Sequence, residues 1–483
     1  MASIKKNFVY QSAYQLLLIV LPLITAPYIA RVLGSENAGV YSYTYTTANY
    51  FVVIAMLGLE QYGNRSIAKV RDDINKRNQV FSELLLLHLV ISILISVIYF
   101  SYVFFFVKEY RFIMIIQGIY VLSAIFDVNW FFFGMELFKL TVIRNIIIKL
   151  LSVLAIFILV NDKTDLWIYA IIMAASMFIS QVILWKFLPK YVSLKMVSIK
   201  SCVLHLRPIL VLFTAVIAAN IYRMFDKVML GWYGHMNNLG CYDYADKIIR
   251  IPLSLITAMG TVMLSKMSNL FARKDTEQAE KMLELSALFV LLMSFAMAFG
   301  IAGIAPEFVI VFLGDGYEES VALIMILAVT LPLIGWNNYI RTQLLIPLQK
   351  DKIYTVGVCT GAVVNVVLNA IFIQFFNAKG AAIATIFSYT AVMVIQTIPL
   401  LKNTKIVSYF RFIPFPFISG VFMLILVRLV GRSMGISVLT VICEIVVGIL
   451  FYGILSIVYL YIMKKELVQK YIDRIQKRIC HIK

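Results

Sequence analysis

The sequence predicts an all-α integral membrane protein with about 14 transmembrane helices. Of its 483 residues, 62% are hydrophobic and only 14% are charged, which is too little polar surface for a soluble protein of this size. A transmembrane helix needs about 20 consecutive apolar residues, and such runs follow one another along the whole chain. A weak internal repeat groups most of the runs into two pseudo-symmetric six-helix lobes, followed by two C-terminal helices.

Fourteen apolar runs can be delimited along the chain. They cover residues 8–33, 39–59, 81–106, 112–133, 140–161, 167–188, 208–233, 240–265, 284–312, 320–346, 353–376, 380–401, 412–430 and 436–463. The second, eighth and tenth runs are the least uniformly apolar. The first run is too long for a cleavable signal peptide and leads into a second span, so no such peptide is expected.

Basic residues predict the orientation of the chain. Most of the 43 Lys and Arg residues fall in loops on the side of the N-terminus, including residues 65–77, 190–207 and 464–483. Because positive loops stay in the cytoplasm, both termini are expected to be cytoplasmic, as an even number of spans requires. The net charge of +18 therefore reports topology, and no nucleic-acid partner is expected, since no motif organises these residues.

The internal repeat is visible where the first and seventh spans end. The first copy reads RVLGSENAGVYSYT and the second reads KVMLGWYGHMNNLGCYDYA. The aligned pairs are Gly34 with Gly231, Gly39 with Gly240, Tyr41 with Tyr242, and Tyr43 with Tyr244. Six spans in each copy give both copies the same orientation, so the repeats are parallel and a binding site is expected between them.

The repeat also defines the expected domains. They are an N-lobe at 1–188, a cytoplasmic linker at 189–207, a C-lobe at 208–402, two further spans at 403–463, and a basic cytoplasmic tail at 464–483. The linker mixes basic and apolar residues, which favours a position along the membrane surface. The tail fits both a helix on anionic lipid and a solvated helix.

Charged residues inside the predicted spans give the strongest indication of function. The basic candidates are Arg31, Arg144, Lys149, Arg223, Lys227, Lys247 and Arg250, and the acidic candidates are Asp127, Asp226, Asp243 and Asp246. A charge at the bilayer centre costs about 2.5–3.5 kcal/mol, so these side chains are expected to face one another or a wet cavity.

Mutual pairing and ligand binding both remain open for these residues. The candidate ion pairs are Asp226 with Lys247 or Arg250, and Arg223 with Asp243 or Asp246. Pairing cannot neutralise the whole set, because seven basic residues face four acidic ones. The surplus predicts an electropositive cavity suited to an anion, above all a phosphate.

Other polar residues supply further candidates. Asn365 and Asn369 lie four apart in the eleventh span, a spacing that suits contact with a sugar or, more commonly, with a neighbouring helix. Asn220 shares the charged face of the seventh span. If an ion is exchanged, the candidate titrating groups are Glu60, Asp127 and Asp226. The five cysteines have no metal-ligand spacing, and neither a metal nor a cofactor is expected.

Segments spread over nearly the whole chain resemble one family of membrane transporters. They are, in order, IKKNFVYQSAYQLLLIVLPLITAPYIARVLGSENAGVYSYT, FDVNWFFFGMELFKLTVIRNIIIKLLS, NIYRMFDKVMLGWYG, APEFVIVFLGDGYEES, GAVVNVVLNAIF and NAKGAAIATI. In sequence, order and spacing they resemble the bacterial polysaccharide repeat-unit flippases, the O-antigen and capsule exporters of the Wzx type. These belong to the multidrug/oligosaccharidyl-lipid/polysaccharide exporter superfamily.

The resemblance implies alternating access and a lipid-linked substrate. An undecaprenyl-pyrophosphate-linked oligosaccharide repeat unit would move from the inner to the outer leaflet of the bacterial plasma membrane. Carried over by motif, the positions expected to receive the pyrophosphate are Arg31, Arg144, Lys149 and Arg223. Besides this substrate, the implied partners are membrane lipids, a polysaccharide polymerase and glycosyltransferases.

Two other functions compete with this expectation. A cation-coupled multidrug exporter of the same superfamily would be favoured by twelve spans and acidic cavity groups, whereas fourteen spans and a positive interior count against it. A membrane enzyme needs carboxylates or a nucleophile on a sizeable aqueous loop. The outer loops here are short and no phosphate-binding Gly-Lys loop is present, so an enzyme is not expected.

Overall fold

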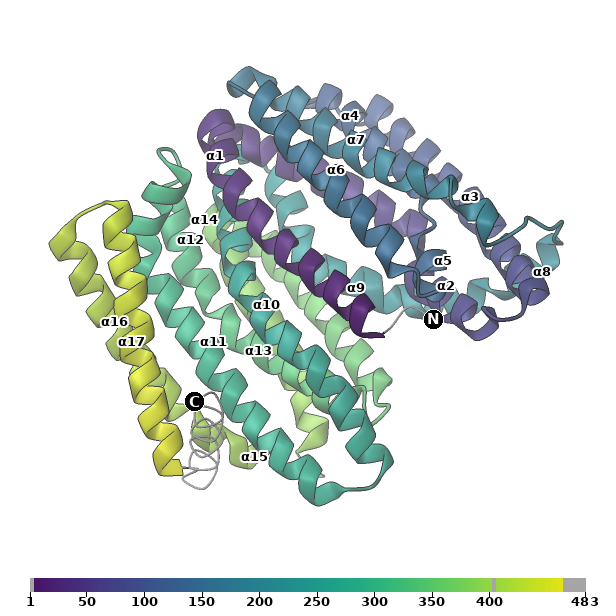
Figure 1. Cartoon of the computed structure of the whole chain (residues 1–483). Coiled ribbons are helices and arrows are strands. Elements are labelled where there is room, and N and C mark those ends of the chain that lie inside the picture. The colour runs from purple at the N-terminus through teal and green to yellow at the C-terminus, as the bar shows by residue number, and fades with distance from the viewer. Residues whose placement is uncertain (1–3, 402–404, 464–483) are drawn as a thin grey trace, which may run out of the picture. The chain divides into compact units, whose positions relative to one another are not determined.

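The computed structural model describes residues 4–401 and 405–463 of the chain (Figure 1). All regular elements in this part are helical, and ten helical segments are long and apolar enough to cross a membrane. An eleventh is counted when Ile199–Thr214 and Val216–Trp232, bent by 41° from each other, form one span. The chain is therefore an all-helical, multi-pass membrane protein.

The helices follow one another with short connections. Their bounds are α1 (Ile4–Met56), α2 (Leu59–Val70), α3 (Ile74–Phe105), α4 (Arg111–Ser123), α5 (Asn129–Gly134), α6 (Phe138–Leu159), α7 (Leu166–Trp185), α8 (Ile199–Leu204), α9 (Leu206–Trp232), α10 (Met236–Ala272), α11 (Thr276–Leu313), α12 (Glu319–Ala328), α13 (Thr330–Ile340), α14 (Asp351–Thr397), α15 (Ile406–Tyr409), α16 (Pro414–Met434) and α17 (Val438–Met463). Short 3-10 turns occur at 124–126, 163–165, 188–190, 398–400 and 410–412, and a π-helical turn at 341–345. The predicted tail at 464–483 lies outside the described residues.

The two longest helices, α1 and α14, are each broken by one residue with positive φ. In α1 this residue is Gly34, with φ 76°, where the sequence predicted the end of the first span. In α14 it is Asn377, with φ 51° and ψ −132°, a backbone conformation that is uncommon for any residue with a side chain. Each of these helices therefore holds two of the predicted apolar runs.

The corresponding break in the second copy of the repeat lies later than the alignment predicted. Gly231, the expected equivalent of Gly34, stays inside α9, where an added Cβ would collide with the ring of Tyr43. The chain reverses at Gly234 instead, which has φ 75° and no atom within 4 Å of an added Cβ. Both glycines occur in the same short segment, so sequence alone did not decide which one adopts positive φ.

The helices form two compact units. The first unit comprises residues 4–244, 313–319 and 358–388, and the second comprises the described residues of 245–312, 320–357 and 389–463.

In the first unit, α1 and α10 cross with their backbones in direct contact at two glycines. A Cβ on Gly39 would lie 3.0 Å from the Gly240 nitrogen, and a Cβ on Gly240 would lie 3.1 Å from the Gly39 nitrogen. Next to this crossing, the Ser35 hydroxyl donates a hydrogen bond to the Asn237 side chain. The pair Gly39 and Gly240, which the repeat aligned, therefore occupies equivalent positions at one crossing.

An aromatic core anchors α5 against α2 and α3 in the first unit. Phe81, Trp130 and Phe131 are fully buried, and the rings of Phe81 and Trp130 stack with centroids 5.4 Å apart. Gly63 on α2 has its Cα against the Trp130 indole, so that an added Cβ would lie 2.6 Å from the ring. This packing fixes the start of α5, which carries part of the polar site described below.

In the second unit, α16 and α17 form a hairpin that packs on α11 (Figure 1). Gly435, with φ 71°, ends α16 and allows the tight reversal. Met423, Val427 and Tyr452 form the buried contact, and the Tyr452 hydroxyl donates a 2.9 Å hydrogen bond to the Leu292 carbonyl of α11.

Candidate functional site

A cavity of about 350 Å³ lies within the first unit, lined by α1, α4, α5, α6 and α7. Its polar lining consists of Thr25, Gln117, Asn129, Arg144, Asn145, Lys149, Ser152, Ser176, Ser180 and Gln181. Its aromatic lining consists of Tyr41, Tyr45, Tyr120 and Tyr169. A concave site with a few charged groups among amides, hydroxyls and aromatic rings is typical of small-molecule and head-group binding.

A break between α4 and α5 carries the first part of the polar lining. Asp127 leaves the helical conformation there and accepts hydrogen bonds on Oδ1 from both the backbone nitrogen and Nδ2 of Asn129, each 2.9 Å long. Its other oxygen accepts a 2.9 Å bond from Nε2 of Gln181 on α7. The carboxylate of Asp127 is thus held by amides, and it orients Asn129 toward the cavity.

Arg144 on α6 is held in place by three neighbouring residues. Its Nη1 atom donates to the Ser180 carbonyl (2.8 Å), and its Nη2 atom donates to Oδ1 of Asn145 (2.7 Å) and Oδ1 of Asn129 (3.1 Å). The side chain is buried, with 7% of the residue exposed. These three acceptors are neutral oxygen atoms that orient the guanidinium, and the carboxylate of Asp127 also interacts with it electrostatically.

Lys149, five residues further along α6, lines the same cavity. Within the part of the chain that the structure describes, its ammonium group has neither an ion pair nor a hydrogen bond. The carboxylate of Asp127 is engaged by Asn129 and Gln181 and is not among the residues that line the cavity. The cavity therefore presents two basic side chains to whatever occupies it.

A groove of about 600 Å³ runs along the first half of α6, beside the end of α7, and the same arginine lies in its lining. Most of its lining is apolar, namely Leu137, Leu140, Ile143, Ile147, Ile148, Ile183, Phe187 and Tyr191. Glu136 and Lys139 also line it, beside the start of α6. Arg144 and Ile148 border both the groove and the polar cavity.

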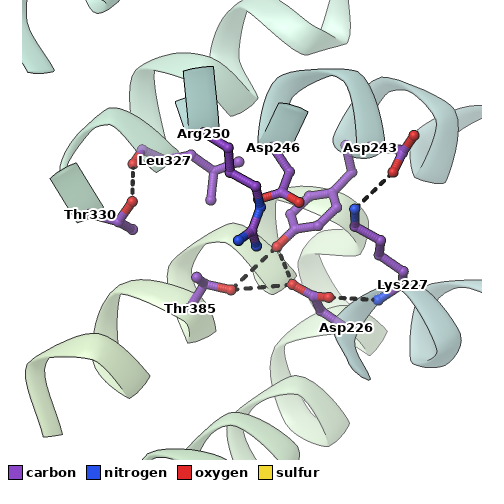
Figure 2. A network of polar contacts seen from close by, with 9 residues as sticks. Asp226, Lys227, Asp243, Asp246, Arg250, Leu327, Thr330 and Thr385 are labelled. Atoms are coloured by element: carbon purple, nitrogen blue, oxygen red, sulfur yellow. Dashed lines mark hydrogen bonds and ion pairs between the residues drawn. The ribbon is translucent and has the colours of Figure 1, made fainter. Parts of the chain in front are cut away.

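Lys227, another predicted basic site residue, forms a buried ion pair. Its Nζ atom donates a 2.8 Å hydrogen bond to Oδ1 of Asp243, and both side chains are less than a tenth exposed (Figure 2). The sequence had proposed Arg223 as the partner of Asp243, so this pairing was not anticipated. It follows from helix geometry, because Lys227 on α9 and Asp243 on α10 face each other beside the turn at Gly234.

Asp226 is also buried, and its Oδ1 atom accepts a 2.8 Å hydrogen bond from the backbone nitrogen of Lys227. The Asp226 carboxylate also accepts from the Tyr242 hydroxyl and, over 3.5 Å, from Oγ1 of Thr385 on α14 (Figure 2). In the second unit, Arg250 donates a 2.8 Å bond to Asp246 one turn earlier in α10. Such pairs four residues apart are common on helix surfaces and need no ligand to explain them.

The remaining predicted site residues do not line the cavity. Arg31, Arg223 and Lys247 are exposed, and so is Glu60 in the first turn of α2. The family resemblance had grouped Arg31 and Arg223 with Arg144 and Lys149; the structure places only the latter two in this cavity.

The three predicted asparagines make contacts within their own helices. Asn365 and Asn369 are fully buried, and Nδ2 of Asn369 donates a 3.0 Å bond to Oδ1 of Asn365. Nδ2 of Asn220 donates to the Val216 carbonyl. For Asn365 and Asn369, burial favours a packing role over contact with a sugar.

Sequence reasoning missed several residues of the site. Asn129 and Asn145 accept hydrogen bonds from Arg144, Gln181 donates one to Asp127, and four tyrosines line the cavity. The available signal was the presence of amide side chains inside apolar runs, where each must find a hydrogen-bond partner.

Two family models match the chain. The model described as "Polysaccharide biosynthesis protein" matches residues 4–271, and that of the "Lipid II flippase MurJ" matches residues 235–462. Among curated proteins, the "Putative O-antigen transporter" of Shigella dysenteriae is 24% identical over 376 residues, covering 76% of this chain and 92% of that protein. The protein of the same name from Escherichia coli (strain K12) is 22% identical over 412 residues, covering 84% and 98%.

Solved structures share the fold. The lipid II flippase MurJ in an inward closed conformation superimposes with a TM-score of 0.74 at 15% identity, covering 95% of this chain and 100% of that chain. An inward-facing multidrug resistance MATE family transporter gives a TM-score of 0.59 at 14% identity, covering 82% and 97%. The similar proteins are transporters and flippases, and the chain is not an enzyme. Because the first family model matches more than half of its length, the chain belongs to the polysaccharide biosynthesis protein family.

Proposed function

We propose that this protein is a flippase that moves undecaprenyl-pyrophosphate-linked oligosaccharide repeat units from the inner to the outer leaflet of a bacterial plasma membrane. Relatives named as O-antigen transporters and the fold shared with a lipid II flippase support this function. The observation that carries the proposal is the cavity of the first unit, in which Arg144 and Lys149 are the basic lining residues.

The two basic side chains suit a pyrophosphate. Arg144 is oriented by Ser180, Asn129 and Asn145, so its charge is presented in a fixed position. Lys149 supplies three donors on a flexible stem. Hydrogen bonds between such cations and phosphate oxygens are roughly twice as strong as neutral ones, and the amide and tyrosine side chains of the same cavity suit the hydroxyl groups of a sugar.

The adjoining groove suits the lipid part of the same substrate. Its isoleucine and leucine side chains offer an apolar path along the first half of α6, and Arg144 lies beside this path. A polyprenyl chain lying there would keep contact with the bilayer while its pyrophosphate reaches the cavity. Arg144 would then lie beside the bond between the lipid chain and its pyrophosphate head group.

The proposed cycle is alternating access in a protein with fourteen spans. This number takes α1 and α14 as two spans each, divided at Gly34 and Asn377. The two lobes would comprise residues 1–188 and 208–402, and both termini would be cytoplasmic. A polysaccharide polymerase and glycosyltransferases would act on the same substrate. A pyrophosphate diester carries about two negative charges, and moving each outward gains about 2.3 kcal/mol per 100 mV when the inside is negative.

The proposal is tested by flipping assays on purified protein in liposomes loaded with lipid-linked oligosaccharide. Arg144→Gln and Lys149→Gln should each lower the flipping rate at least about tenfold, since each removes a charge-assisted contact of about 1.5–3 kcal/mol. Lys108→Gln, an exposed residue between α3 and α4, is the matched control and should flip normally. Normal flipping by both cavity variants at equal protein levels would refute the proposal.

The same liposomes separate this function from multidrug export. A drug exporter would be expected to bind organic cations through carboxylates, whereas the cavity described here is lined by cations. Uptake of a cationic dye coupled to sodium or proton movement, without flipping of lipid-linked oligosaccharide, would favour the exporter.

A further inference from the structure

A cluster of three charged side chains lies within the second unit, on helices that line neither the cavity nor the groove. Glu307 comes from α11, Arg428 from α16 and Glu444 from α17. Nη1 of Arg428 donates to Oε2 of Glu307 and, over 3.2 Å, to the Gly303 carbonyl. The cluster ties the hairpin of α16 and α17 to α11.

Glu444 occupies an unusual position in this cluster. It is completely buried, and neither of its carboxyl oxygens has a hydrogen-bond partner among the residues that the structure describes. The Arg428 guanidinium, which bonds Glu307, comes no closer than 3.9 Å to it. An ionised carboxylate without hydrogen bonds is strongly disfavoured in an apolar interior.

The backbone of α16 brings the two carboxyl groups together. At Gly431 an added Cβ would lie 2.8 Å from Oε1 of Glu307 and would collide with Oε1 of Glu444. The two oxygen atoms therefore face one point on the surface of α16, where only a glycine leaves room for both. Two carboxylates this close repel each other when both are ionised.

The charges of the cluster do not balance. One guanidinium faces two carboxyl groups, and its shortest contact is with Glu307. The next polar side chains on α17 have other partners, since Thr440 bonds Ser437 and Tyr452 bonds Leu292. Within the described part of the chain, the charged groups of this contact are Glu307 on α11, Arg428 on α16 and Glu444 on α17.

We propose that Glu307, Arg428 and Glu444 form a proton-binding site, in which one proton is held on Glu444 and shared with Glu307. The proton cancels the charge that Arg428 leaves uncompensated and supplies the missing hydrogen bond between the two carboxyl groups. Protonation therefore secures the hairpin of α16 and α17 on α11. This inference does not depend on the proposed flippase function.

The proposal has a definite sign for the effect of pH. The folded protein holds a proton at neutral pH that the same carboxyl group, exposed to water after unfolding, releases. The stability that this proton contributes is therefore complete at pH values where the unfolded carboxyl is also protonated, and it is lost as the pH rises through the point at which the folded site releases its proton. Glu444→Gln imitates the protonated carboxyl and should remove this dependence.

Infrared difference spectroscopy on purified full-length protein in lipid tests the site directly. At neutral pH the wild-type protein should show the C=O stretching band of a protonated carboxylic acid, and this band should be absent from Glu444→Gln and shifted in Glu307→Gln. Glu277→Gln, an exposed glutamate at the start of the same helix α11, is the control and should leave the band unchanged.

Thermal unfolding between pH 6 and pH 9 provides the second readout. The wild-type unfolding temperature should decrease with pH more steeply than that of Glu444→Gln, while Glu277→Gln should follow the wild type. Identical carboxylic-acid bands in wild type and Glu444→Gln would overturn the proposal. A second result would also overturn it: the wild-type protein lacks the carboxylic-acid band and has a higher unfolding temperature in sodium than in choline salts. The site would then hold a metal cation and not a proton.

Discussion

Nζ of Lys227 and Oδ1 of Asp243 lie 2.8 Å apart in a buried ion pair between α9 and α10. The pair joins these helices beside the turn at Gly234, and it uses a lysine that the charge pattern had assigned to substrate binding. Lys227 and Asp243 therefore both have a structural role, and their contribution to the stability of the folded protein can be measured separately from transport.

Removing one partner of this pair should destabilise the protein more than removing both. Lys227→Gln or Asp243→Asn alone leaves one charge buried, with an expected loss of about 3–5 kcal/mol. The double variant leaves no uncompensated charge within the pair and should lose less than the sum of the two. Thermal unfolding of the three variants in detergent measures this, and strictly additive losses would contradict the pairing.

Arg144→Lys should impair flipping although it keeps the positive charge. A lysine cannot bond the Ser180 carbonyl, Asn129 and Asn145 with the planar geometry of a guanidinium, so its charge would no longer be fixed at the cavity wall. We expect a flipping rate at least about tenfold below wild type, equivalent to about 1.5 kcal/mol. A rate equal to wild type in the liposome assay would show that charge alone suffices.

The groove along α6 and α7 should lose its function when it is filled. Ile147→Trp places a bulky ring in the apolar lining, and we expect a several-fold lower flipping rate with an unchanged unfolding temperature. Leu154→Trp is the control, because Leu154 is an exposed apolar residue of the same helix outside the groove lining. Equal rates for the two variants would exclude the groove as the path of the lipid chain.

Alanine at the glycine crossing of α1 and α10 should destabilise the first unit. A Cβ on Gly39 would collide with the Met236 carbonyl group, so Gly39→Ala must separate the two helices. Gly453→Ala in α17 meets no atom within 4 Å and should be neutral or gain about 0.5–1 kcal/mol, as expected for alanine in a helix. A Gly39→Ala protein that unfolds at the wild-type temperature would contradict the close crossing.

The sequence predicted the class of fold and the two cavity cations for simple physical reasons. Apolar runs long enough to cross a bilayer are visible without tertiary information, and a basic residue inside such a run needs a polar environment. Arg144 and Lys149 both met this criterion and both line the cavity. Arg31 and Arg223 met the same criterion but do not line the cavity. The criterion says that a charged side chain needs a polar environment, and it does not say which polar environment the side chain enters.

Features that depend on tertiary packing were missed. The orientation of Arg144 by Asn129 follows from a helix break at Asp127, which the apolar run concealed. The cluster of Glu307, Arg428 and Glu444 was overlooked, although each of the three interrupts a predicted span. Counting every charge within the spans would have included it, but which of them meet is decided by the packing of α16 and α17 on α11.

Binding of the lipid anchor tests the central claim most directly. The affinity of the purified protein for undecaprenyl diphosphate and for undecaprenol, which lacks the phosphates, can be compared by native mass spectrometry. We predict that the wild-type protein prefers the diphosphate by at least about tenfold, and that Arg144→Gln combined with Lys149→Gln removes this preference. An undiminished preference in the double variant would show that the pyrophosphate binds elsewhere and would contradict the account.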